Sequence, residues 1–347
     1  MAKEKSGGAV STAVKWAGYL TLIFSICGTV WGVGKYLRAQ AETRKSVAAL
    51  VATAAEEQKA RDYSSAWGTL DRAVQLDADA DTVQTAQLNL AMAWLEDVHL
   101  SENQKFSDVT GKVEPVLVRA AAGMRAGARR ADVRAYIGWA YFLDTRDGRM
   151  DLDPARAYQD VTAEDPNNPY AGAMWGHWIL WRRCEQLPEA KKHFDAALAS
   201  GREASFVRRL EMSAVLNCHT DAANAEAVRT ANEMRKAGEK VSEAMVSDLL
   251  AIYSYEFSPA SSSTAEFVRA VPPAEHLATF DWLFGGLDPG TGNAWARAYY
   301  RGAIEEAAGQ RDSALADYRL ASDHLSQGSS ELGQPARAAV KRLTQAH

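Results

Sequence analysis

One spacing of small and large side chains recurs along this chain and restricts what it can fold into. A small residue is followed by a large one four positions later and by another small one three positions after that. The triplets are Ala66–Leu70–Ala73, Ala190–Phe194–Ala197 and Ala314–Tyr318–Ala321. Residues at these spacings share one face of an α-helix, and small side chains let a second helix pack closely there. The recurrence predicts closely packed helix pairs, repeated along the chain.

The rest of the sequence after residue 45 is also typical of helices. No stretch beyond residue 45 shows a sustained alternation of apolar and polar residues, and Ala, Leu, Glu, Arg and Gln are abundant. All ten prolines lie at or after Pro115, mostly between helical patterns or in the first turn of one. The sequence therefore predicts an all-α fold.

A further small residue lies upstream of each triplet: Ala54, Gly176 and Gly302. This pattern resembles the tetratricopeptide repeat, a helix–turn–helix unit of about 34 residues with Gly or Ala at its eighth position. The resemblance implies an α-solenoid of about six to seven helical pairs and a C-terminal capping helix at 333–346. The clearest repeats are 47–80, 131–168, 169–202 and 295–326, and the regions 81–125, 203–237 and 241–285 match more weakly as helical pairs.

An apolar run, KWAGYLTLIFSICGTVWGVGKYLRAQ, precedes the repeats. Residues 16–34 carry no charge, and at about 1.5 Å per residue they span roughly 29 Å, the thickness of a bilayer's hydrocarbon core. Lys and Arg flank the run on both sides, and Trp and Tyr lie near its ends, as at membrane interfaces. We predict a transmembrane helix at 16–37, between a basic tail at 1–15 and the repeat domain at 38–347.

A cleaved signal peptide is the alternative interpretation of this run, because Ala39–Ala41 has the small-x-small form of a cleavage site. Against cleavage, the run is long, and Lys35 and Arg38 lie where a neutral segment is expected. No Pro or Gly occurs from Lys35 to Trp67. We therefore favour an uncleaved anchor and predict one nearly continuous helix from Trp16 to about Lys59.

Gly28 and Gly32 lie four positions apart inside the run. Small residues at this spacing let two membrane helices approach closely, although Gly is also common in membrane helices generally. The pair allows a homodimer through the transmembrane helix.

Charge is distributed unevenly along the chain. The first 45 residues have a net charge of +5 and the whole chain has −5, so the remainder carries −10. An acidic body argues against nucleic acid as a partner, whereas the basic residues lie where they would meet lipid headgroups. Lys and Arg are nearly balanced across the run. The short basic head favours an inward N-terminus in a plasma (inner) membrane, with the repeats on the periplasmic or external side.

The sequence contains no motif of a known chemistry. Its seven histidines are scattered, and HExxH, GxSxG and a Gly-rich phosphate loop are all missing. We predict no enzymatic activity, no cofactor and no metal. Asp144, Asp147, Asp151 and Asp153 lack the spacing and the closing Glu of a calcium loop, which favours a solvated turn.

Cys184 and Cys218 are 34 residues apart. A bridge between them would need an oxidising compartment. If they hold equivalent places in neighbouring repeats, we expect their backbones to lie too far apart to bridge without strain.

The family resemblance also implies a binding groove, because the first helix of each tetratricopeptide pair lines a concave surface. The matching positions here are Asp132, Trp139, Phe142, Tyr170, His177 and Trp181. Three Trp residues at 175, 178 and 181 sweep more helix surface than one core stripe holds, although most helical Trp is core. We predict a membrane-anchored scaffold that binds a segment of an unidentified protein in this groove. The alternative is a non-catalytic structural or assembly subunit of a larger membrane complex, which should present a broad apolar face.

Overall fold

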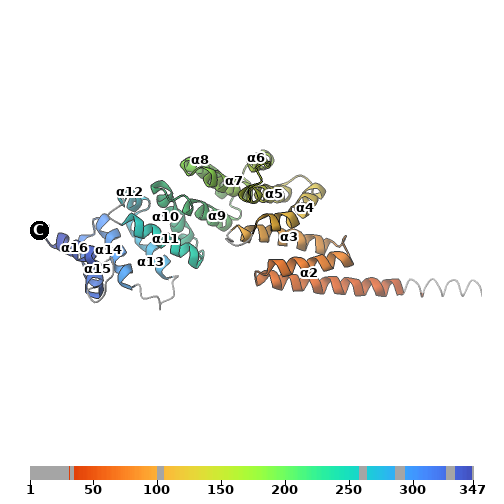
Figure 1. The fold of residues 1–347 in the computed structure, drawn as a ribbon, viewed down its shortest axis with the longest axis horizontal. Helices are drawn as coiled ribbons and strands as arrows, with labels where there is room; N and C mark the ends of the chain where they lie inside the picture. Colours follow the sequence, from red (N-terminus) through yellow and green to blue (C-terminus); the bar gives the residue numbers. More distant parts are fainter. Residues whose placement is uncertain are drawn as a thin grey trace, which may run out of the picture. The chain divides into compact units, whose positions relative to one another are not determined.

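The computed structural model describes residues 31, 35–99, 105–257, 264–285, 294–325 and 333–345. Every regular element in these ranges is a helix, and none is a strand (Figure 1). The predicted all-α class is therefore confirmed. The chain forms two compact units, Met1–Leu117 and Val118–His347.

The first unit begins with an unbroken helix at 35–59. This confirms the C-terminal part of the predicted long helix. The predicted transmembrane segment, with Gly28 and Gly32, lies almost entirely outside the described residues. Among the helices that the structure does describe, none is both long enough and apolar enough to span a bilayer.

A tight turn joins this helix to α2 (Tyr63–Leu76). Arg61 adopts a positive φ of 61°, and the Asp62 carboxylate accepts a hydrogen bond of 3.1 Å from the backbone N–H of Ser65, which caps the new helix. The turn lies where the repeat 47–80 predicts one. Helix α3 (Asp81–Val98) follows, and α4 (Ser107–Gly123) runs across the boundary between the units.

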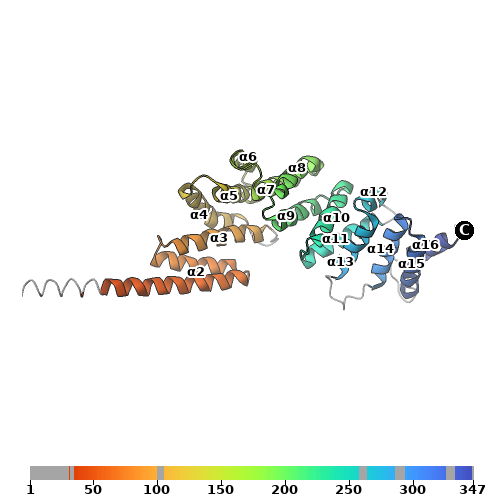
Figure 2. The same ribbon diagram turned by 180° about the vertical axis from the view of Figure 1, so that it is seen from behind.

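The second unit continues as helix–turn–helix pairs (Figure 2). The pairs are α5 (Ala128–Arg146) with α6 (Pro154–Glu164), α7 (Pro169–Arg182) with α8 (Leu187–Ala199), α9 (Ala204–Leu216) with α10 (Asp221–Lys236), and α14 (Ala294–Ala307) with α15 (Arg311–Leu325). A short 3-10 helix, η1 (Cys184–Gln186), joins α7 to α8. The final helix, α16 (Gly333–Gln345), packs on α15 within the stretch predicted as a cap.

Small residues bring the paired helices into close contact. A Cβ atom at Gly172 would lie 2.8 Å from the carbonyl oxygen of His193, and one at Gly176 would lie 2.8 Å from the Phe194 ring. The first residues of the three triplets are completely buried: Ala66, Ala190 and Ala314. The predicted burial of these three Ala residues is therefore confirmed, and the helices pack in successive helix–turn–helix pairs.

The region 241–285 differs from the predicted helix pair. It forms three helices, α11 (Glu243–Glu256), α12 (Thr264–Arg269) and α13 (Pro273–Gly285). Helix α10 packs against all three and against α9, so that every residue from 223 to 232 except Arg229 is buried. A helix enclosed on so many sides has almost no solvent face over this stretch.

The acidic turn between α5 and α6 is only partly solvated. Asp144 is 1% exposed, and its carboxylate accepts a hydrogen bond of 3.0 Å from the Arg149 guanidinium. Asp153 caps α6 by accepting from the backbone N–H of Arg156. The prediction of a solvated turn is therefore wrong for Asp144. Its carboxylate can be buried because the Arg149 guanidinium pairs with it.

Candidate functional site

Three of the predicted groove residues are core residues. The exposed fractions of Trp139, Phe142 and His177 are 1%, 0% and 4%. The His177 ring lies edge-on to both of the others, with centroid distances of 5.2 Å to Trp139 and 5.5 Å to Phe142. These side chains fill the space between α5 and α7. The prediction that they line an open groove is therefore wrong, since rings this large reach across to the neighbouring helix.

Two further groove residues keep some exposed surface. Trp181 is 43% exposed, and its ring contacts Phe142 at a centroid distance of 5.3 Å. Tyr170 is half-buried between Tyr136 and Phe206, at 5.1 Å and 5.0 Å. The exposed part of the predicted groove thus shrinks to one Trp ring and the edge of one Tyr.

The sixth residue, Asp132, is part of a buried polar network and not of an open surface. It is 6% exposed. Its carboxylate accepts hydrogen bonds from Asn168 at 2.8 Å and from the Arg202 guanidinium at 2.9 and 2.8 Å. Asn168 also caps α7 by accepting from the backbone N–H of Ala171. The network joins the N-terminal ends of α5, α7 and α9, the first helices of three successive pairs.

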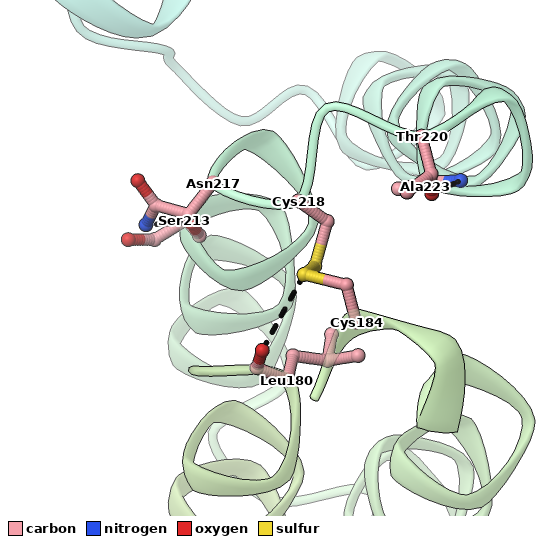
Figure 3. The surroundings of a disulfide bond; sticks show 7 residues. All are labelled: Leu180, Cys184, Ser213, Asn217, Cys218, Thr220 and Ala223. Carbon is pink, nitrogen blue, oxygen red and sulfur yellow. Dashed lines mark hydrogen bonds between the residues drawn. A yellow bond between two sulfur atoms is a disulfide. The ribbon is translucent and has the colours of Figure 1, made fainter. Parts of the chain in front are cut away.

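A disulfide between Cys184 and Cys218 joins the C-terminal ends of α7 and α9 (Figure 3). The Cα atoms are 5.4 Å apart, within the range that a bridge needs, so the expectation that they lie too far apart is wrong. The two residues do hold equivalent places, but both follow the last turn of their helix. They are therefore not held at the 8–10 Å that separates the axes of packed helices. The Sγ atom of Cys184 also lies 3.5 Å from the carbonyl oxygen of Leu180.

A hollow of about 530 Å³ lies elsewhere in the second unit, lined by α8, α9, α10 and the start of α13. None of the predicted groove residues lines it. The apolar residues of its lining include Leu198, Val271 and Pro272. The charged residues of the lining are Lys191, Asp195, Arg208, Glu211, Glu226, Arg229, Glu233, Lys236 and Glu275. Its volume is within the range of ligand-binding pockets.

Most charges around this hollow are paired. The Glu226 carboxylate, whose side chain is 3% exposed, lies 2.9 Å from the Lys191 ammonium and 2.6 Å from the Arg229 guanidinium. At the other side, Lys236 lies 2.8 Å from the Glu275 carboxylate. Pairing of this kind offsets the desolvation of buried carboxylates.

Glu211 is the exception among the buried charges. The residue is 4% exposed, it lines the hollow, and within the described part of the chain its carboxylate has neither a hydrogen-bond donor nor an ion-pair partner. Burial, together with the nearby charges of Glu226 and Asp195, raises the pKa of this carboxyl from 4.5 to about 7, although Lys191 and Arg229 oppose the rise. Both effects disfavour the ionised form.

Replacing Glu211 with Gln should stabilise the protein at high pH. Because the folded-state pKa is raised, the carboxyl is neutral in both states below pH 4.5 and costs nothing there. As pH rises towards about 7, the carboxyl ionises in the unfolded chain before it ionises in the folded protein. The free energy of unfolding therefore falls by up to about 3 kcal/mol. Glu211→Gln should therefore match wild type at pH 4.5 and exceed it at pH 8.

Chemical denaturation of both full-length proteins across this pH range measures the difference in free energy of unfolding. Glu189→Gln on α8 is the matched control, because its carboxylate is 53% exposed. A Glu211→Gln protein that is less stable than wild type at pH 8 would contradict this account of the carboxylate.

No known protein family and no curated protein matches the chain. A solved structure of a tetratricopeptide repeat protein from Parabacteroides merdae ATCC 43184 is similar at 15% sequence identity and a TM-score of 0.36, covering 87% of this chain and 100% of that one. Within the described ranges, no three His, Cys, Asp or Glu side chains are grouped to hold a metal ion.

Proposed function

We propose that this chain is a scaffold that holds a partner protein at a membrane by binding one of its segments on the helical repeats. The observation that carries the proposal is the hollow between α8, α9, α10 and α13. It draws its walls from consecutive helix pairs. The Asp132 network and the disulfide tie the first helices of these pairs together, which favours a preformed site.

The N-terminal residues support attachment to a membrane. Trp31, Tyr36 and Leu37 are 66%, 66% and 55% exposed, and the Lys35 ammonium lies 3.7 Å from the centre of the Trp31 ring. Exposed aromatic rings beside basic groups are typical of the headgroup level of a bilayer. Together with the uncharged run before them, they favour an anchor that ends near residue 37.

The disulfide supports placing the repeats on the external side. Such bonds persist in oxidising compartments and are rare where thiols are kept reduced. A bridge between Cys184 and Cys218 therefore favours a periplasmic or extracellular location for the second unit.

The distribution of apolar surface favours a scaffold over an obligate structural subunit. Apart from the N-terminal group of Trp31, Tyr36 and Leu37, the large exposed apolar side chains in the described ranges lie on separate elements, among them Leu76 on α2, Trp181 on α7, Tyr255 on α11 and Leu320 on α15. An obligate interface needs a broad continuous apolar face, and scattered exposed residues do not form one.

Site-specific photocrosslinking tests the scaffold function. A photoreactive amino acid replaces Leu198, which lines the hollow, in the full-length protein expressed in the cells that make it. Irradiation should yield one discrete protein adduct. The matched control carries the same amino acid at Leu320, which is 48% exposed and lies outside the hollow. The same adducts from both positions, or none from position 198, would refute the proposed binding site.

A further inference from the structure

We infer that the hollow between α8, α9, α10 and α13 is a binding site for a cationic group on an aliphatic stem, an alkylammonium or a guanidinium, with the Glu211 carboxylate as its anchor. The inference deepens the proposed function and rests on it for the identity of the ligand, because it states which chemical group of a partner the scaffold would bind.

The first support is the state of the Glu211 side chain. A buried carboxylate without a donor is unfavourable, and native proteins pair nearly all buried polar groups. Glu211 is 4% exposed and borders an open hollow. Neither carboxylate oxygen is sealed from solvent, so a donor that enters the hollow can reach the carboxylate.

The second support is the charge around this carboxylate. Helix α8 contributes Lys191 and Asp195, and α10 contributes Glu226 and Arg229. The two cations already pair with Glu226. With Glu211 ionised, this group has three negative and two positive charges, so one entering cation neutralises it. An entering anion would instead face an unpaired buried carboxylate.

The third support is the apolar part of the lining. Leu198, Val271 and Pro272 line the same hollow as Glu211. The side chains of Lys and Arg place apolar methylene stems against such surfaces while the charged head reaches a polar partner. A small inorganic cation would leave these apolar residues uncovered. The combination of apolar lining and anchor therefore fits a long basic side chain or a polyamine.

Ligand-observed NMR on the full-length protein in zwitterionic nanodiscs tests the site. The probes are N-acetyl-lysine methylamide, its arginine counterpart and spermidine, at pH 8 and constant ionic strength. The neutral probe N-acetyl-glutamine methylamide and empty nanodiscs measure background binding. We expect at least one cationic probe to bind more strongly than the neutral one. Glu211→Gln should weaken that binding at least about tenfold, equivalent to about 1.4 kcal/mol.

Glu189→Gln is the matched variant, since it removes the same charge from α8 without touching the hollow, and it should bind like wild type. Equal dissociation constants for wild type and Glu211→Gln, or no preference for cationic probes, would overturn the inference. Binding by the amino-acid probes would identify protein side chains as the source of the cation. Binding by spermidine alone would identify a free amine.

The two proposals fail separately. If the crosslinked partner is recovered equally from wild type and Glu211→Gln, the scaffold function stands and the cation site is wrong. If the cationic probes bind through Glu211 but position 198 yields no protein adduct, the cation site stands and the scaffold function is wrong.

Discussion

Phe142→Ala is expected to lower the free energy of unfolding by about 3–5 kcal/mol, because removing a buried aromatic ring leaves a cavity that the surrounding core fills only in part. Phe142 is completely buried and contacts Trp139, His177 and Trp181. Chemical denaturation of the full-length protein, followed by tryptophan fluorescence, measures the loss.

Trp181→Ala is the matched comparison, since its ring contacts Phe142 yet is 43% exposed. It should cost clearly less stability than Phe142→Ala. A Phe142→Ala protein as stable as wild type, with weakened binding of a partner, would restore the groove predicted from the family resemblance.

The difference between these two rings shows what the sequence could predict. The positions of Ala66, Ala190 and Ala314 correctly predicted buried helix contacts, because a small side chain on a helix face lets a second helix approach closely. The groove positions came from a family pattern and not from the residues themselves. The run from Tyr136 to Leu143 contains no charged residue, and a helix that is apolar all round is a buried one. That signal favoured the core.

The hollow and its anchor were harder to predict. Glu211 follows Leu210 and precedes Met212, Ala214 and Val215, so it is the one acidic residue in an apolar stretch of α9. Such a residue indicates an unusual site. Its surroundings come from Lys191, Glu226 and the loop before α13, and no spacing within one repeat relates these segments. The loop joins α12 to α13, which both pack against α10. The sequence predicted only two helices in the region 241–285, so the position of this loop was not predicted.

Loss of the disulfide is expected to lower the free energy of unfolding by about 2–4 kcal/mol, since the bond closes a loop between residues 34 apart in sequence and restricts the unfolded chain. The variant with both Cys184→Ser and Cys218→Ser should unfold at a correspondingly lower denaturant concentration. Wild type treated with a reductant should behave like this variant.

Cys27→Ser is the control, because this residue belongs to the predicted membrane segment and should leave the reductant effect unchanged. Alkylation with a maleimide reagent in intact cells tests the bond directly. Cys184 and Cys218 should react only after reduction. If both thiols react without reductant, and reduction leaves the unfolding midpoint unchanged, then neither the bond nor the external location that it favours holds.

The helix at 35–59 fixes a direction as well as a position. Its first buried residue is Val47, which is 4% exposed, whereas residues 35–42 are exposed. The projecting stretch 35–46 is about 18 Å long at 1.5 Å per residue. Each residue of it also turns the chain by about 100°, so the number of residues before Val47 determines the azimuth at which residue 35 leaves the unit. Adding one residue to this stretch would rotate everything before it by nearly a third of a turn, whereas adding seven would restore the original azimuth to within about 20°.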